Sequence, residues 1–173
     1  MSNIDSKNTK YGLSAALIEL TRNADRMSSI NISAVAFEAN MHRNTVYYHF
    51  RDMRELCLWT IHDELVKLIG GRDYFEVRDG MATFFSRFRP LLLFTRHELG
   101  TEEYLKSMRL EILPLVEPLT AGPAITSEEA KKVAVDTFVE QIIVASVVHE
   151  HPEKMIRLIF TSIMPEVLRH ELI

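Results

Sequence analysis

The chain has 173 residues, 47% of them hydrophobic, a content too high for an intrinsically disordered protein. Its longest apolar runs are too short to span a bilayer, residues 1–10 lack the apolar core of a secretory signal, and the single cysteine cannot form an internal disulfide. We therefore expect a cytoplasmic protein with no membrane partner.

The formal net charge of −4 belongs to the C-terminal part of the chain. Residues 1–60 hold seven Lys and Arg against six Asp and Glu, whereas the remaining residues hold 13 Lys and Arg against 18 Asp and Glu.

The first predicted helix is about three turns long, because apolar residues recur in it at helical spacing. Ser6 or Thr9 is expected to cap its N-terminus. Its apolar positions are Leu13, Ala16, Leu17 and Leu20. This helix is expected to brace the segment that follows.

A helix-turn-helix is predicted from residue 31 onward. Asn31 is a good N-cap, since its amide oxygen can accept from the free N–H groups of the first turn. Asn40 stands where the chain must reverse, and Asn tolerates the left-handed conformation that a sharp turn needs. A second helix should begin at His42, with Val46 as its inward residue. The apolar positions of the first helix are Ile32, Val35, Ala36 and Ala39.

The outward face of the second helix carries side chains that suit DNA. Arg43 and Asn44 can pair bidentately with base edges, whereas Thr and Tyr hydroxyls suit phosphate oxygens. We expect Tyr48 also to face the bases. Tyr47 either contacts a phosphate or is half-buried, and His49 either contacts DNA or has a structural role. The predicted DNA-contacting residues are Asn31, Ser33, His42, Arg43, Asn44, Thr45, Tyr47, Tyr48, His49, Arg51 and Arg54.

Another helix, with its own N-terminal cap, directly follows the second helix of the helix-turn-helix. Asp52 and Glu55 form a capping-box-like start, and Phe50 can anchor the junction in the core. Helix starts this close together predict a compact three-helix head. Because this head is nearly neutral, we expect few phosphate contacts in each subunit and a symmetric dimer that multiplies the affinity.

These residues resemble the TetR family of bacterial transcriptional regulators. The resemblance rests on Ala36, on the turn residue Asn40, on the Thr-Val-Tyr-Tyr-His-Phe run of residues 45–50, and on the apolar Leu56. It implies an all-α protein with a helix-turn-helix DNA-binding domain over residues 1–51 and a helical ligand-binding and dimerisation domain over residues 52–173. It further implies a homodimeric repressor that binds a palindromic operator and is released or modulated by a small effector.

Two residues depart from the family pattern. Asn40 replaces the usual turn Gly, which the left-handed argument makes acceptable. Met53 replaces the usual Lys that contacts phosphate at the start of the fourth helix, and Met cannot make that contact. Either Arg51 or Arg54 substitutes for it, or DNA affinity is reduced. The alternative function is a TetR-like coactivator that works through protein contacts and binds DNA weakly or not at all.

The body is predicted to be helical throughout. Helix four should run from Asp52 toward Ile69 and end at residues 70–71, which are both Gly. A Phe-rich helix is expected from about Asp79, kinked or broken at Pro90. Its aromatic residues and those that follow are either plain core or the lining of a pocket for a small apolar effector. The six residues in question are Met81, Phe84, Phe85, Phe88, Tyr104 and Met108.

Prolines are expected to set the remaining boundaries. Pro114 and Pro118 should divide the next segment into one or two short helices before a loop through residues 122–123. Thr126 and Glu129 form another capping box, which starts a long helix from residue 127 to about 148. Pro152 suits the first position of a last helix, residues 153 to about 169, which Pro165 should kink or end.

The last two helices carry apolar residues on more than one face. We expect the surplus to be buried against a second subunit, in a four-helix dimer interface. The expected interface residues are Phe138, Ile142, Ala145, Ile156, Ile159, Phe160 and Ile163.

Other chemistry has little support. The His149-Glu150-His151 triplet has no third ligand in view, so a helix cap or an exposed turn is favoured over a metal site. Cys57 is expected to be a buried thiol, with redox sensing as the alternative. We expect no cofactor, no metal and no catalytic residue, since no phosphate loop, HExxH or nucleophile elbow occurs; a small helical enzyme remains the rival class.

Overall fold

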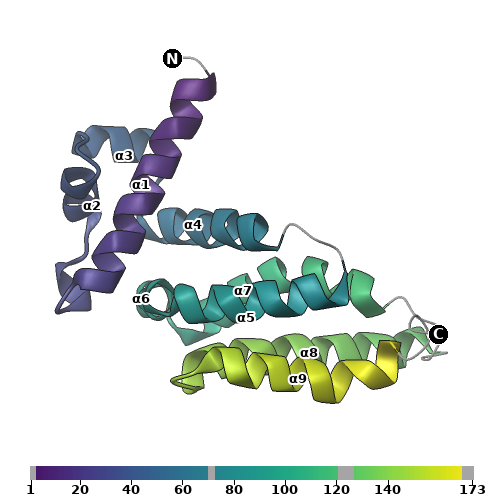
Figure 1. Ribbon diagram of the computed structural model, residues 1–173. Helices are drawn as coiled ribbons and strands as arrows, with labels where there is room; N and C mark the ends of the chain where they lie inside the picture. Colours follow the sequence, from purple (N-terminus) through teal and green to yellow (C-terminus); the bar gives the residue numbers. More distant parts are fainter. Residues whose placement is uncertain (1–2, 70–72, 121–126, 169–173) are drawn as a thin grey trace. The chain divides into compact units, whose positions relative to one another are not determined.

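All regular secondary structure in the described residues is helical, as predicted. The computed structural model describes residues 3–69, 73–120 and 127–168 (Figure 1). Its elements are α1 (Asn3–Asn23), the 3-10 helix η1 (Met27–Ser29), α2 (Ile32–Glu38), α3 (Arg43–His49), α4 (Met53–Leu68), α5 (Tyr74–Arg87), α6 (Arg89–Leu99), α7 (Thr101–Val116), the 3-10 helix η2 (Glu117–Thr120), α8 (Glu128–Val148) and α9 (Pro152–Leu168).

Two compact units divide the chain. Unit 1 comprises Met1–Asp63 and Pro90–Thr101, and unit 2 comprises Glu64–Arg89 and Glu102–Ile173. The division falls inside α4, whereas the predicted domain boundary at residues 51/52 coincides with the start of that helix.

Unit 1 is built on α1, against which α2 and α3 pack (Figure 1). Leu13, Leu17 and Val35 are fully buried in it. The helix α1 begins earlier than predicted, so Ser6 and Thr9 lie inside it and neither caps it. These first turns are not predictable from apolar periodicity, because residues 3–10 are mostly polar.

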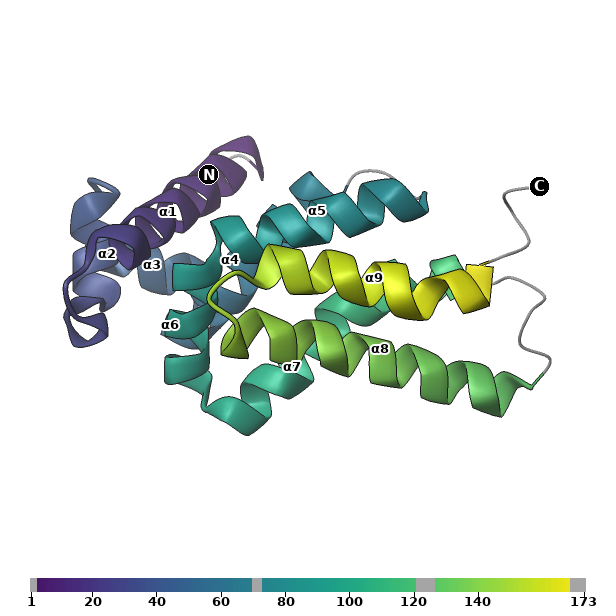
Figure 2. The same cartoon turned by 60° about the horizontal axis from the view of Figure 1, so that its bottom comes forward.

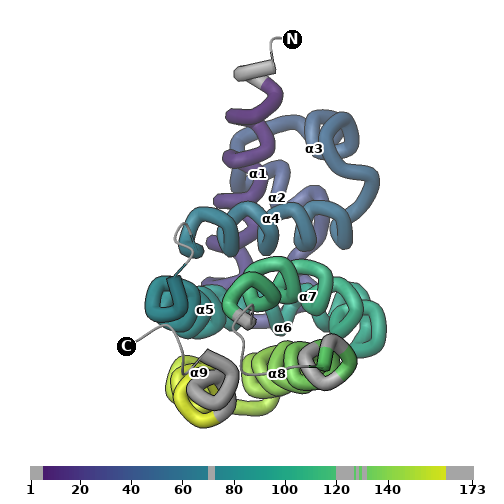
Figure 3. The backbone as a smooth tube through the Cα atoms, turned by 90° about the vertical axis from the view of Figure 1, so that its right-hand side faces the viewer, coloured from purple at the N-terminus to yellow at the C-terminus, as the bar shows by residue number. Residues whose placement is uncertain are grey.

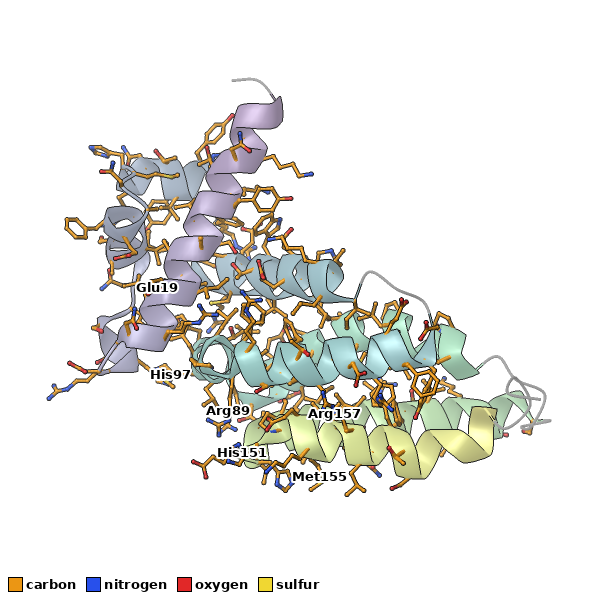
Figure 4. All side chains as sticks on the ribbon, in the orientation of Figure 1. Glu19, Arg89, His97, His151, Met155 and Arg157 are labelled. Carbon is orange, nitrogen blue, oxygen red and sulfur yellow. The ribbon has the colours of Figure 1, made fainter. Side chains whose placement is uncertain are left out.

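Unit 2 contains α5, α7, α8 and α9, and Figure 3 views α5, α8 and α9 nearly end on. The helix α9 packs along both α5 and α8 (Figure 2). The Tyr74 hydroxyl donates to the Phe160 carbonyl at 2.5 Å, and Arg157 of α9 lies 3.5 Å from the Asp79 carboxylate of α5 (Figure 4). These polar contacts fix α5 and α9 in one register.

Proline has different consequences at different sites. Pro90 is the second residue of α6, where a missing N–H costs nothing, so it separates α5 from α6. Pro114, by contrast, lies inside a continuous α7, and the prediction that it divides this helix is wrong. It falls in the last turn and is exposed, and the burial of Ile112 and Val116 outweighs one lost hydrogen bond.

The remaining boundaries of the body follow the prediction in part. Pro152 is the first residue of α9, as predicted, and α9 continues beyond Pro165, which therefore does not end it. The helix α8 spans nearly the predicted range. The predicted cap residue Thr126 and the predicted loop at residues 122–123 lie outside the described residues.

Gly80 of α5 lies close to the backbone of residues 68–69. A Cβ added there would lie 3.0 Å from the Leu68 carbonyl oxygen and 3.0 Å from Ile69 Cγ1. We expect Gly80→Ala to lower the free energy of unfolding by about 1 kcal/mol in urea denaturation, because the overpacking outweighs the helix propensity that Ala gains.

Gly12→Ala is the matched control for this prediction. A Cβ at Gly12 would lie 2.9 Å from Met41 Cε, which is the free end of a flexible side chain. It can move aside at little cost, so this variant should be at least as stable as the wild type. Equal stability of the two variants would contradict the role assigned to Gly80.

Candidate nucleic-acid interface

The start of α2 is fixed by Asn31. Its Oδ1 accepts from the backbone N–H groups of Ser33 at 3.0 Å and Ala34 at 3.1 Å, which confirms the predicted N-cap. Its Nδ2 donates to the Ser29 carbonyl at 3.3 Å. The Asn31 side chain is thus hydrogen-bonded to backbone groups of neighbouring residues, whereas Ser33 is exposed.

The turn between α2 and α3 depends on Asn40. This residue has a φ of 52°, which confirms the predicted left-handed conformation. The Met41 N–H donates to the Ala36 carbonyl at 2.8 Å and closes the turn. The helix α3 begins at Arg43, one residue later than predicted, with His42 as its N-cap.

The helix α3 has one inward and one outward side. Val46 and the following Phe50 are buried, as predicted. Arg43 and Asn44 are exposed, and Tyr48 has an exposed fraction of 71%. The residues predicted to face the bases are therefore on the surface of unit 1.

Arg43 and Tyr47 form a pair along α3. The Arg43 guanidinium donates to the Tyr47 hydroxyl at 3.0 Å, and its carbon lies 5.4 Å from the centroid of the Tyr47 ring. The Tyr47 side chain is 45% exposed. The ring thus holds the guanidinium on the outer face of α3.

The start of α4 is capped as predicted. The Glu55 N–H donates to Asp52 Oδ1 at 2.9 Å, and the Arg51 N–H donates to Glu55 Oε2 at 2.6 Å. The pKa of Asp52 is lowered, mainly by the hydrogen bond from the Glu55 backbone and also by Arg51, whose Nε lies 3.3 Å from the Asp52 carboxylate. The Arg51 side chain itself is 83% exposed.

Met53, the first residue of α4, is buried, with 8% of its surface exposed. Its apolar side chain belongs to the core, so this position supplies no positive charge to the surface. Arg54, the next residue, is exposed. Any phosphate contact at this junction must therefore come from other residues.

His49 closes α3 in a partly buried position. Its Nε2 is buried and has no hydrogen-bond partner in the described part of the chain, and burial, with the charge of Lys10 as a second cause, lowers the pKa of His49 below the ordinary 6.5. The folded state therefore binds this proton less readily than the unfolded state.

This shift predicts a pH-dependent stability. The contribution of neutral His49 to the free energy of unfolding is fully present above pH 6.5. It is lost as the pH falls from 6.5 toward the lower pKa that His49 has in the folded state. We expect the decrease in thermal midpoint between pH 7.5 and pH 5 to be smaller in His49→Gln than in the wild type. His42→Gln, a change at an exposed histidine, serves as control, and an identical decrease in all three proteins would refute this role of His49.

Two features of unit 1 were not predicted from the sequence. Phe37 on α2 has an exposed fraction of 86%, and Lys10 on α1 lies over the rings of Phe50 and Trp59. Phe37 falls outside the apolar spacing of α2, and that spacing was the signal that would have placed it on the surface. The position of Lys10 depends on tertiary packing, which no local pattern encodes.

The six residues of the predicted effector pocket lie in unit 2, in α5, at its C-cap and in α7. Each is buried, with 2% or less of its surface exposed. The Phe84 ring lies 5.3 Å from the rings of both Phe85 and Phe88. Phe84, Phe85 and Phe88 thus form an aromatic cluster in the interior of unit 2.

The residues expected to form the dimer interface lie in α8 and α9, and those that the structure describes face the interior of the chain. Phe138, Ile142, Ala145, Ile156, Ile159 and Phe160 are all buried within the single chain, and the Ile163 side chain lies outside the described residues. Side chains that their own subunit covers have little surface left for a partner. The surplus apolar face of α8 and α9 consists instead of Val133, Val144, Val148 and Leu158, which are 51% to 69% exposed.

The His149-Glu150-His151 triplet forms the exposed turn between α8 and α9, as favoured from the sequence (Figure 4). Arg89 Nε donates to the His149 carbonyl at 3.3 Å, and His151 Nδ1 lies 3.6 Å from the Glu153 carboxylate. No group of three potential metal ligands occurs among the described residues. Cys57 is fully buried, and burial raises the pKa of its thiol to about 12.

Comparison with known proteins gives a likeness in structure and none in sequence. No family profile matches the chain, and no curated protein matches it. Among solved structures it is similar to the TetR family repressor AlkX from Dietzia sp. strain DQ12-45-1b, which is implicated in biodegradation of n-alkanes. The TM-score is 0.50 at 16% identity, over 92% of this chain and 95% of that chain.

The chain has a TetR-like fold. This likeness spans both units, whereas the sequence resemblance was limited to the helix-turn-helix segment. Throughout the described ranges, none of the helices combines the length and apolar character required to cross a membrane.

Proposed function

We propose that this protein is a DNA-binding transcriptional regulator, a repressor that binds a roughly palindromic operator as a homodimer. The observation that carries the proposal is the build of α3: a buried Val46 on one side, and exposed Arg43, Asn44 and Tyr48 on the other. The left-handed turn at Asn40 sets this helix against α2. In a helix-turn-helix, the second helix enters the major groove and reads base edges.

The direct test is an electrophoretic mobility shift with DNA from upstream of the protein's own coding sequence. We expect a retarded band that survives an excess of random competitor DNA. A band that disappears equally with specific and random competitor would reduce the proposal to non-specific DNA binding. Absence of any band at low salt would reject it.

The homodimer is proposed because it would raise the affinity for DNA. The near-neutral head offers few phosphate contacts, so one head alone would bind weakly, and two heads on one duplex multiply the affinity. The partner-facing surface is proposed to be the apolar stripe of Val133, Val144 and Val148 on α8, together with Leu158 on α9. The spacings of 11 and 4 residues place the three valines on one side of α8.

Control by a small apolar effector is the finer part of the proposal. The cluster of Phe84, Phe85 and Phe88 is apolar and buried in unit 2, so an apolar molecule entering it would have to displace those side chains. A ligand that prefers the rearranged state would change DNA affinity by its coupling free energy. Such a ligand should raise the thermal midpoint and alter the mobility shift together.

A second function is favoured by two observations. Met53 contributes no charge at the start of α4, and Phe37 presents an 86% exposed aromatic ring on α2. A TetR-like coactivator that binds a protein partner through unit 1 and DNA weakly or not at all would fit both. A mobility shift that appears only when a second protein is added would favour this function over the first.

A further inference from the structure

Lys10 of α1 reaches the end of the reader helix. Its Nζ lies 5.3 Å from the centroid of the Phe50 ring and 5.7 Å from that of the Trp59 ring. Phe50 directly follows α3, and Trp59 belongs to α4. The same charge contributes to the lowered pKa of His49, the last residue of α3. The ammonium therefore lies where α3 ends and α4 begins.

The other positive charge next to α4, that of Arg51, is partly compensated by a neighbouring carboxylate. Asp52 caps α4 and faces Arg51 at 3.3 Å, so part of the Arg51 charge is compensated within the chain. Met53 is apolar and buried. Arg54 is exposed. At this junction α4 contributes Arg54 but no charge from Met53. Lys10 of α1 therefore adds a positive charge to this surface.

We propose that Lys10 contacts a DNA phosphate beside the C-terminal end of the reader helix, together with Arg51 and Arg54. This inference rests on the proposed DNA-binding function. An ammonium resting on two aromatic faces still has N–H donors that point away from the rings. Because the rings already restrict the lysine, less conformational entropy is lost when it binds phosphate.

The experiment compares the salt dependence of DNA binding in the full-length wild type and in Lys10→Met. Methionine keeps an apolar chain over Phe50 and Trp59 and removes the charge. The slope of log Kobs against log salt should become shallower by about 0.9 for each bound subunit. Since phosphate contacts carry no sequence information, the loss should be equal on operator and on random duplex. Lys10→Arg should retain the wild-type slope.

Lys106→Met is the matched control, because Lys106 is an exposed lysine of unit 2 in a surface pair with Glu102. It removes the same charge and should leave the slope unchanged. Thermal unfolding of every variant reports whether it is folded, and Lys10→Gln replaces Lys10→Met if the latter does not fold.

Three results would overturn the inference. An unchanged slope with a lowered thermal midpoint would make Lys10 a structural residue alone, and a loss confined to the operator would make it a reader of bases. In both cases the wild type still binds DNA, so the proposed function survives. A wild type that binds no duplex at low salt would overturn both proposals together.

Discussion

Arg43→Ala is expected to reduce the preference for operator over random DNA by about 1 to 3 kcal/mol for each half-site, the discrimination typical of one bidentate base contact. Arg43 is exposed on α3, and Tyr47 holds its guanidinium by a hydrogen bond of 3.0 Å. Alanine removes the donor fork and should leave the helix intact, because Arg43 is exposed and its partner Tyr47 is itself 45% exposed. The measurement is a pair of dissociation constants, one on each DNA, at the same salt concentration.

Two companion variants separate base reading from charge. Arg43→Lys keeps the charge but loses the planar fork, so it should bind random DNA as the wild type does and still discriminate poorly. Arg51→Ala should weaken binding to both DNAs alike, because Arg51 is expected to contact phosphate. Equal losses on operator and random DNA for Arg43→Ala would refute its role as a base reader.

Val144→Glu is expected to convert the proposed dimer into single subunits and to lower operator affinity by a factor on the order of 10² to 10⁴, the gain that two linked binding modules provide. Val144 is 51% exposed on the apolar stripe of α8, near the exposed Glu140. In a symmetric interface the introduced carboxylate of each subunit would be removed from water. The free-energy penalty of this desolvation would therefore apply twice in every dimer.

Light scattering gives the mass and a mobility shift gives the affinity of this variant. Leu110→Glu is the control, since Leu110 is an apolar residue of α7 with an exposed fraction of 72% and lies outside the stripe. It should keep both the mass and the affinity of the wild type. A Val144→Glu protein that retains the wild-type mass would exclude the α8 stripe as the interface.

Local signals predicted the helix-turn-helix well. Asn31, Asn40 and the Asp52–Glu55 box each act through a few neighbouring backbone groups, so their sequence context carries the needed information. The start of α5 had such a signal too. Asp73 accepts from the Glu76 N–H at 2.9 Å, yet the helix was predicted to begin only near Asp79.

Other features depend on tertiary contacts that no local pattern records. Pro114 remains helical because the inner face of α7 is buried, a gain that proline's local preference does not include. An apolar surplus on a helix cannot say whether its own chain or a second chain covers it. Phe138 and Ile142 are covered by their own chain, and Val144 and Val148 are not. For the same reason the sequence did not reveal Lys10 at the end of α3.

Selection of bound sequences from a random DNA pool tests most directly the central claim that α3 reads DNA. We expect enrichment of a two-fold symmetric sequence whose half-sites lie about 34 to 36 Å apart, or a multiple of that spacing. The enrichment should disappear with Arg43→Ala. A bound pool with the same base composition and symmetry as the starting pool would show that α3 does not read DNA sequence.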